Sequence, residues 1–254
     1  MRRFTLAPDR IRDGHVVFDR DETHHLVRVL RLDPGQLVVV ADGHGHEYIV
    51  RVEAIGDTAT GTVVRQGTSA VESPLAVTLV QGIPKGDKIE QIVRAATELG
   101  LRGVQPVITS RTVVRLELSR WRERARRWQR VAKEAAKQSG RAVVPDVHAP
   151  QLLADWLAAA PTTDAGTLRL CLWEGAARPL GEVVADVATP PSAVVVLVGP
   201  EGGLAREEVD VARARGFVPV GLGPRILRCE TAGPAVVAIL QFRFGDLAAR
   251  APLR

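Results

Sequence analysis

The 254-residue chain is 46% hydrophobic and 25% charged, the balance of an ordinary globular protein, and its length suits two modest domains. Its net charge of +5 favours an anionic partner. The sequence contains no run of about 18 apolar residues, which argues against a transmembrane helix, and its opening residues do not resemble a secretory signal. We therefore expect a cytoplasmic protein with no membrane partner.

The first seventy residues are predicted to form short strands separated by turns, a pattern typical of a small β-barrel. The pattern changes at Ser73, which places the boundary between an N-terminal domain (residues 1–72) and a C-terminal domain (residues 73–254). The expected N-terminal strands cover residues 15–18, 37–41, 48–54 and 60–65.

Beyond Ser73, apolar strands alternate with helical segments, which predicts an α/β domain whose largely parallel sheet carries helices on both faces. Trp121 and Trp128 fall on the apolar stripe of one helix and are predicted to anchor it in the core. The expected strands cover residues 75–81, 104–108, 168–173, 193–198 and 217–221, and the helices residues 87–99, 119–139, 151–159, 205–214 and 231–244.

Basic residues are concentrated in one segment, residues 119–141. It holds nine arginines and lysines against two glutamates, so it carries a net charge of +7 and the remaining chain −2. A local patch of this kind is the pattern expected where a protein neutralises phosphates of a nucleic acid. A solvated helix face is the alternative.

The cysteines and histidines do not indicate a metal site. Cys171 and Cys229 lie far apart and form no CxxC motif, so we expect neither a disulfide framework nor a zinc site. His44 and His46 lie in a glycine-rich segment, which a turn explains better than a metal. We therefore expect no metal.

Two glycine-proline loops are the most informative segments. The first, residues 199–204, follows the apolar strand at 193–198, and the second, residues 221–232, follows the strand at 217–221. Ligands of α/β sheets bind beyond the carboxyl ends of strands, so the two loops predict one shared pocket. The first loop lacks the GxGxxG spacing of a dinucleotide site.

Both loops also have a purely structural interpretation. The first could be a plain turn between strand and helix. In the second, Arg225, Arg228, Glu230 and Thr231 crowd polar groups among apolar neighbours, which is costly unless a ligand or an internal partner satisfies them. An Arg–Glu ion pair and a threonine cap on the last helix would satisfy them without a ligand.

Five segments occur in order along the chain at residues 82–88, 94–100, 134–141, 198–203 and 222–232. They closely resemble motifs of the bacterial ribosomal RNA small subunit methyltransferase E family. Cys229 and Arg94 depart from the family pattern, but neither change removes a charge or a glycine. An N-terminal match at residues 24–31, followed by Pro34-Gly35, resembles the PUA-like domain of the same family.

This resemblance implies a SPOUT-type α/β domain with a C-terminal trefoil knot, preceded by a small PUA-like β-barrel that binds RNA. It also implies a homodimer and an enzyme that uses S-adenosyl-L-methionine to methylate N3 of a uridine in 16S ribosomal RNA of the small ribosomal subunit. Two alternatives are a SPOUT ribose 2′-O-methyltransferase and a noncatalytic RNA-binding or ribosome-assembly protein.

The resemblance assigns cofactor contacts mainly to backbone groups of the two loops. Arg228 and Arg225 are expected to stabilise charge on the uracil oxygens, and Glu201 or Glu230 to take the proton of N3 or orient the base. The expected cofactor-binding residues are Leu197, Val198, Gly199, Pro200, Glu201, Gly202, Gly203, Leu222, Gly223, Pro224, Ile226, Leu227, Thr231 and Ala232.

RNA is expected to be held by the N-terminal domain and the basic helix through phosphate contacts that position the substrate without reading its sequence. The expected RNA-binding residues are Arg28, Arg31, Lys85, Arg122, Arg126, Arg130, Lys133, Lys137 and Arg141.

Overall fold

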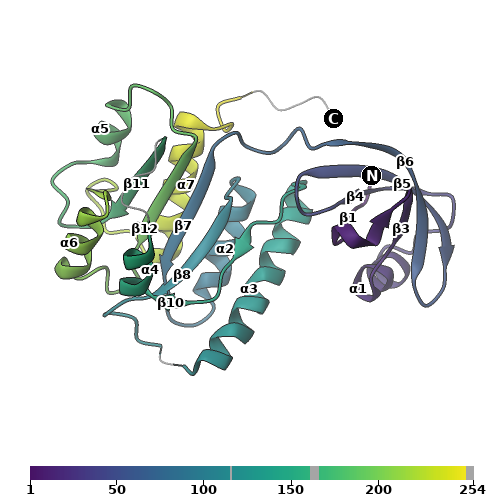
Figure 1. Ribbon diagram of the computed structural model, residues 1–254, viewed down its shortest axis with the longest axis horizontal. Coiled ribbons are helices and arrows are strands. Elements are labelled where there is room, and N and C mark those ends of the chain that lie inside the picture. Colours follow the sequence, from purple (N-terminus) through teal and green to yellow (C-terminus); the bar gives the residue numbers. More distant parts are fainter. Residues whose placement is uncertain (115, 161–165, 250–254) are drawn as a thin grey trace. The chain divides into compact units, whose positions relative to one another are not determined.

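The computed structural model describes residues 1–114, 116–160 and 166–249, which form two compact units (Figure 1). The first unit consists of Met1–Glu72 and Lys133–Val144, and the second of Ser73–Ala132 and residues 145–249. The return of Lys133–Val144 to the first unit was not expected from the sequence. Residues 250–254, the end of the expected second domain, lie outside the described part. Among the described residues, no helix combines the length and apolar character needed to cross a bilayer.

The first unit contains a six-stranded sheet in the order β1-β4-β5-β6-β3-β2. Only the β1–β4 pair is parallel. A short helix, α1 (Arg20–His24), continues into a π-helical turn, His25–Val29. The strands are β1 (Arg3–Thr5), β2 (Ile11–Arg12), β3 (His15–Val17), β4 (Leu37–Ala41), β5 (His46–Ile55) and β6 (Ala59–Thr68).

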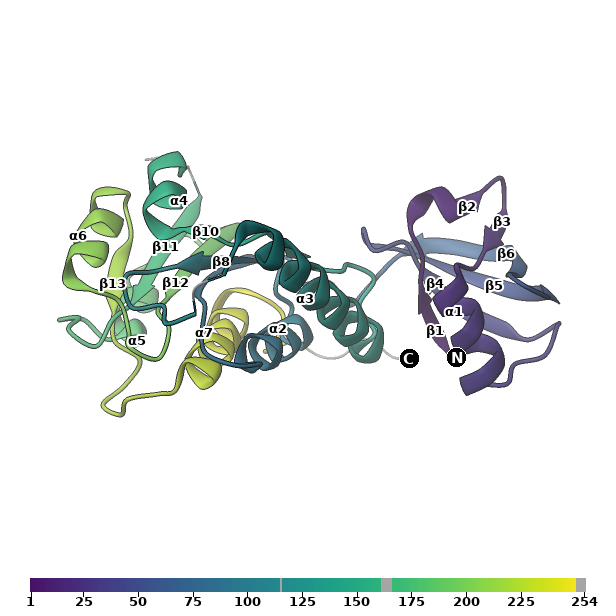
Figure 2. The same cartoon turned by 90° about the horizontal axis from the view of Figure 1, so that it is seen from below.

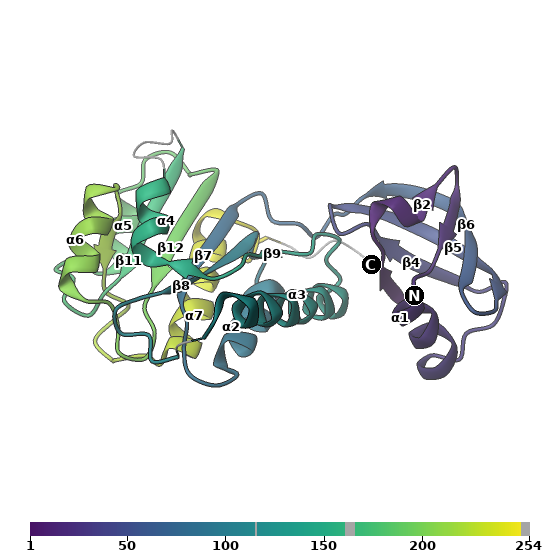
Figure 3. The same cartoon turned by 60° about the horizontal axis from the view of Figure 1, so that its bottom comes forward.

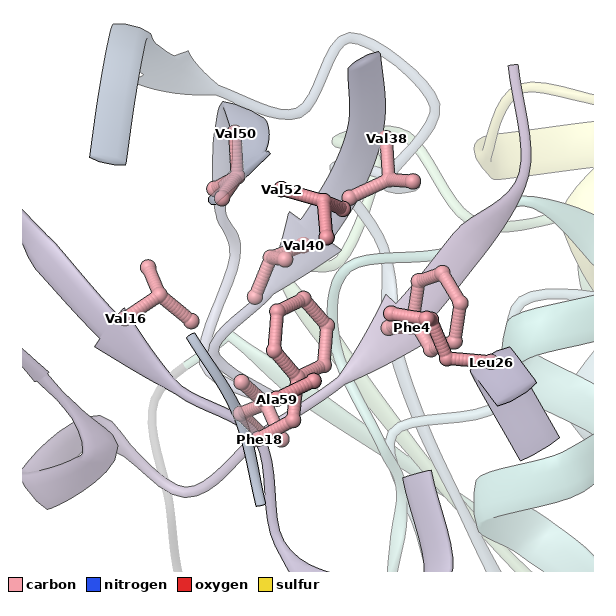
Figure 4. Close-up of a cluster of buried hydrophobic side chains, with 10 residues drawn as sticks. Phe4, Val16, Phe18, Leu26, Val38, Val40, Val50, Val52 and Ala59 are labelled. Atoms are coloured by element: carbon pink, nitrogen blue, oxygen red, sulfur yellow. The ribbon is translucent and has the colours of Figure 1, made fainter. Parts of the chain in front are cut away.

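The core of this unit comes from alternate residues of its strands and from α1 and the turn after it. Val38 and Val40 point inward from β4, as the two-residue period of a strand requires. Phe4 and Phe18 pack edge to face with ring centroids 5.3 Å apart, and Leu26 closes the cluster (Figure 4). Burial of these apolar side chains holds the short strands together.

Residues 141–144 join the first unit through Glu72. One oxygen of its carboxylate accepts hydrogen bonds from Nε and Nη2 of Arg141, at 3.1 and 2.9 Å. The other oxygen accepts from the backbone N–H groups of Ala142 and Val143. Both side chains of the ion pair are largely buried. Glu72 therefore fixes this second segment of the unit.

Three expected RNA-binding residues have internal partners in this unit. Lys137 Nζ lies 2.7 Å from Glu22 Oε2, with both side chains almost buried, and Lys133 faces the same carboxylate at 3.7 Å. Arg141 is 5% exposed and is paired with Glu72. The interpretation of Lys137 and Arg141 as phosphate contacts is therefore corrected: their charges serve the fold.

The second unit contains a parallel sheet of seven strands in the order β10-β8-β7-β12-β11-β13, with β9 paired to β8. The predicted alternation of strands and helices is confirmed, and the fold is α/β. The strands are β7 (Ala76–Gly82), β8 (Gly103–Ile108), β9 (Asp146–Val147), β10 (Gln151–Leu152), β11 (Thr167–Leu172), β12 (Ala193–Val198) and β13 (Val218–Val220).

Helices cover both faces of this sheet. α2 and α7 pack together on one face, and α4 and α6 lie together on the other (Figure 2). Their bounds are α2 (Lys88–Glu98), α3 (Leu118–Ser139), α4 (Leu153–Ala159), α5 (Leu180–Ala185), α6 (Arg206–Ala214) and α7 (Cys229–Phe244).

The long helix α3 lies beside α2 (Figure 3), where Arg127 Nε contacts Glu90 Oε1 at 2.7 Å. Trp121 and Trp128 are each 2% exposed, with ring centroids 6.4 Å apart, which confirms their expected place in the core. The opposite face of the helix carries the exposed arginines. The amphipathic pattern therefore sets which charges remain available to a partner.

We predict that Glu72→Ala lowers the free energy of unfolding by about 3 kcal/mol, because it removes one partner of a buried ion pair. Urea denaturation followed by circular dichroism measures the change. The matched control is Glu53→Ala in the same unit, whose exposed carboxylate accepts from Thr62 and whose loss should cost less than about 1 kcal/mol. Equal losses in the two variants would contradict the structural role of Glu72.

Candidate active site

A pocket of about 470 Å³ opens at the carboxyl ends of β11, β12 and β13. These three strands are neighbours in the sheet, so the loops that follow them meet at one edge. The structure thus brings together the two glycine-proline loops. The pocket is lined by Lys88, Arg111, Leu172, Trp173, Glu174, residues 198–204, residues 220–229 and Ala232.

Most residues expected in the site line this pocket, including Glu201, Arg225 and Arg228, but three do not. Leu197 is fully buried in the core beneath the loop. Thr231 is exposed on the first turn of α7, and Glu230 reaches the site only through its contacts with lining residues. Leu197 and Thr231, which were expected to bind the cofactor, therefore lie outside the lining of this pocket.

The first loop is packed too tightly for larger residues. A Cβ atom on Gly199 would lie 2.7 Å from the carbonyl carbon of Gly203, and one on Gly82 would lie 2.6 Å from the backbone nitrogen of Pro200. Gly203 has a φ of +68°, a conformation that glycine adopts without steric cost. These contacts hold the loop in one conformation, in which residues 198–204 line the pocket.

Lys88 links the carboxylates of the site, although sequence reasoning did not single it out. Its Nζ donates to Glu201 Oε1 at 2.9 Å and lies 3.6 Å from Glu230 Oε2. Glu201 also accepts from the backbone N–H of Lys85 at 3.1 Å. The start of α2, the first loop and the start of α7 are therefore joined by one ammonium group.

These contacts keep both carboxylates ionised. Burial raises the pKa of Glu201, but the hydrogen bonds from Lys88 and from the Lys85 backbone outweigh it, and the net pKa is lowered. The pKa of Glu230 is lowered chiefly by a hydrogen bond from its own backbone N–H, with help from Cys229 and Lys88. The hydrogen bond to Glu201 raises the pKa of Lys88. At neutral pH the cluster of Lys88, Glu201 and Glu230 therefore contains two anions and a cation.

Cys229 is a neutral donor within this cluster. Its Sγ lies 3.2 Å from Glu230 Oε2, and burial, with the neighbouring carboxylates, raises the pKa of the thiol to about 12. The thiol therefore stays protonated at neutral pH and donates to Glu230.

The arginines of the second loop are exposed. The side chain of Arg228 is 84% exposed, and its Nη1 lies 4.0 Å from Glu230 Oε1, the outer limit of an ion pair. Arg228 is the N-cap of α7 and no side chain caps that helix, so Thr231 is not the cap. Of the structural alternative for this loop, the threonine cap is therefore wrong and the Arg–Glu ion pair is present only at its longest distance. Both guanidinium groups are exposed and available to a ligand.

Several pocket residues were missed from the sequence, namely Lys88, Arg111, Trp173, Glu174 and Cys229. Lys88 had a detectable signal, because it follows β7, whose carboxyl end lies beside that of β12. Trp173 and Glu174 follow β11 in the same way.

The remaining expected RNA-binding residues are exposed. Arg28 and Arg31 lie on the first unit, Lys85 lies before α2, and Arg122, Arg126 and Arg130 lie on α3.

We predict that the side-chain carboxyl of Glu201 titrates below its ordinary pKa of 4.5 and that Lys88→Met moves the midpoint upward, because the hydrogen bond and the positive charge of Lys88 both lower this pKa. Carbon-13 NMR measures the titration midpoint in the wild-type protein and in Lys88→Met, and Glu201→Gln serves to assign the resonance. The pKa of Glu201 is lower in the folded protein than in the unfolded chain. Its contribution to the free energy of unfolding is therefore complete above the ordinary pKa and disappears as the pH falls through the lowered value. Lys85→Met is the control, since Lys85 contacts Glu201 through its backbone. An unmoved midpoint in Lys88→Met would refute this assignment.

Comparison with known proteins identifies the family. Residues 71–241 match the model of the RNA methyltransferase domain, and residues 18–60 match that of the RNA methyltransferase PUA domain. The chain is 36% identical to ribosomal RNA small subunit methyltransferase E of Synechocystis sp., over 93% of this chain and 76% of the relative. It is 34% identical to the protein of that name from Bacillus subtilis, over 84% of each chain.

A solved structure agrees with these matches. The crystal structure of ribosomal RNA small subunit methyltransferase E from Neisseria gonorrhoeae bound to S-adenosyl methionine is similar with a TM-score of 0.86 and 34% identity, over 97% of this chain and 99% of the other. The chain belongs to the ribosomal RNA small subunit methyltransferase E family.

Proposed function

We propose that this protein transfers the methyl group of S-adenosyl-L-methionine to N3 of a specific uridine in 16S ribosomal RNA of the small ribosomal subunit. The observation that carries the proposal is the pocket between the two glycine-proline loops. The Neisseria gonorrhoeae relative, which shares 34% of its sequence with this chain, binds S-adenosyl methionine.

The pocket fits this cofactor in size and in chemistry. Its volume of about 470 Å³ falls in the range of small-molecule sites. The glycine-rich residues 198–204 line the pocket, and their backbone N–H and C=O groups suit adenine and the methionine moiety without demanding particular side chains. Bound there, the cofactor supplies an electrophilic methyl group on a sulfonium. We assign its contacts to the backbone of residues 198–203 and 222–227 and to Ala232.

The protein's own groups must prepare uridine N3 for attack. The neutral imide nitrogen has no available lone pair, so its proton has to leave. Glu201 and Glu230 are the ionised carboxylates that can accept that proton or orient the base. Arg225 and Arg228 are exposed at the second loop, where their guanidinium groups can stabilise negative charge on the uracil oxygens.

We assign RNA binding to the N-terminal domain, residues 1–72, and methyl transfer to the C-terminal domain, residues 73–254. The match of residues 18–60 to a PUA domain supports the first assignment. Exposed arginines and lysines would contact phosphates without reading sequence. They are Arg28, Arg31, Lys85, Arg122, Arg126 and Arg130. The substrate places this activity in the cytoplasm.

We further propose a homodimer and a C-terminal trefoil knot of the SPOUT type. Exposed apolar side chains support the dimer: Ile239 and Phe242 on α7 are 39% and 66% exposed, and Leu247 beyond it is 45% exposed. The contacts of α7 with α2, β7 and β12, beside the two paired loops, are consistent with the knot.

We predict that purified protein restores 3-methyluridine to small ribosomal subunits from cells that lack it, as measured by nucleoside mass spectrometry. Ribose methylation would instead indicate a 2′-O-methyltransferase, and no transfer would indicate a noncatalytic RNA-binding or assembly protein.

Arg228→Ala should lower the turnover number about a hundredfold, because one donor to the developing charge is lost. Isothermal titration should show unchanged affinity for S-adenosyl-L-methionine. Wild-type turnover in this variant would reject the role assigned to Arg228.

We predict that Gly199→Ala weakens S-adenosyl-L-methionine binding at least about tenfold, since a Cβ atom there would overlap backbone atoms and shift the loop. Isothermal titration measures the affinity. The control is Gly181→Ala in α5, where a Cβ atom meets no neighbour within 4 Å. Undiminished binding by Gly199→Ala would exclude the first loop as the cofactor site.

A further inference from the structure

Arg111 lies on a turn that immediately follows β8 and is held in place by its neighbours. The backbone N–H of Thr109 donates to Thr112 Oγ1 at 2.9 Å, and the two hydroxyl groups lie 3.1 Å apart. The backbone N–H of Ser110 donates to Glu208 Oε1 at 2.7 Å. Because both threonines are buried, this turn is a fixed support for the exposed arginine between them.

The side chain of Arg111 lies along the first glycine loop. Its Nη1 donates to the carbonyl oxygen of Gly202 at 2.6 Å. Its aliphatic stem packs on the same residue, since a Cβ atom on Gly202 would lie 3.3 Å from Arg111 Cβ. The arginine therefore has a defined position at the rim of the pocket that it lines.

Most of the donors of this guanidinium are unused within the described part of the chain. The group carries five N–H donors, and the hydrogen bond to Gly202 uses one of them. The nearby carboxylate of Glu208 is occupied by the backbone N–H groups of Ser110 and Ala205. A positioned, solvent-exposed guanidinium with free donors is suited to bind an oxyanion.

We propose that Arg111 binds a phosphate oxygen of the RNA backbone next to the target uridine. This inference rests on the proposed function, because it assumes that RNA approaches this pocket. Gly202, which Arg111 contacts, is itself exposed, so an RNA strand bound at this pocket could reach the guanidinium group. The same segment of chain leads into α3, where Arg120 and Arg122 are also exposed.

Two other ligands, the cofactor and the uracil base, fit the position of Arg111 less well. The carboxylate of the cofactor belongs to a small molecule, and such ligands bury most of their surface inside a pocket. The uracil base must enter the pocket to reach the methyl group, whereas its phosphate stays at the rim. The fork of a guanidinium also matches the geometry of a phosphate.

The test measures the salt dependence of binding to small ribosomal subunits that lack 3-methyluridine. For wild-type protein, the logarithm of the association constant should fall linearly with the logarithm of salt concentration. Arg111→Met should reduce the magnitude of the slope of this line by about one, as expected for the loss of one phosphate contact. Arg111→Lys keeps the positive charge and should restore the wild-type slope.

The matched control is Arg102→Met. Arg102 is exposed and precedes β8, so it lies at the opposite end of that strand from Arg111 and should leave the slope unchanged. Isothermal titration of Arg111→Met with S-adenosyl-L-methionine should give wild-type affinity, which also demonstrates an intact pocket.

An unchanged slope in Arg111→Met would overturn the phosphate contact. Weakened S-adenosyl-L-methionine binding would overturn it in favour of a role in supporting the glycine loop or binding the cofactor. The slope comes from binding measurements alone and does not depend on methyl transfer. Failure of wild-type protein to methylate the subunits with labelled S-adenosyl-L-methionine would therefore refute the proposed function separately.

Discussion

The close approach of two backbone segments, at Gly82 and at Gly199-Pro200, is the contact on which the site depends. β7 and β12 run in parallel with Gln81 opposite Val198, so the next residue of each strand meets the other at the sheet edge. Only a hydrogen atom fits between Gly82 and Pro200. This contact brings the start of α2 to the first loop and so places Lys88 beside Glu201.

The ion pairs of Lys88 lower the basicity of the Glu201 and Glu230 carboxylates. A carboxylate whose pKa is lowered is ionised at neutral pH and can accept a proton, but it is a weaker base than an unperturbed carboxylate. In the proposed reaction, strong basicity of these carboxylates would therefore not be the source of the acceleration. Alignment of the nucleotide with the methyl donor, and stabilisation of charge on the uracil oxygens, would supply a larger share.

Local patterns predicted the fold well because they record local physics. Apolar runs and glycine turns identified the strands and both loops, and the helical stripe placed Trp121 and Trp128 in the core. Charge counting was less reliable, because it cannot detect partners that are distant in sequence. Lys137 and Arg141 contributed to a predicted RNA surface, yet their partners are Glu22 and Glu72. Arg111 was missed for the same reason, because the sheet order and not its neighbours in sequence brings it to the pocket, whereas the position of Lys88 after β7 was a detectable signal.

The first unit is built from two segments that are distant in sequence, and this affects the order in which its contacts form during synthesis. Domains generally fold as units, and the N-terminal one usually folds first. Here, within the described part of the chain, the carboxylate of Glu72 accepts four hydrogen bonds from residues 141–143. The N-terminal unit thus cannot complete its contacts until the chain has been translated past β7, α2, β8 and α3. The buried apolar core of that unit, by contrast, comes from residues 4–59 and can pack before those hydrogen bonds form.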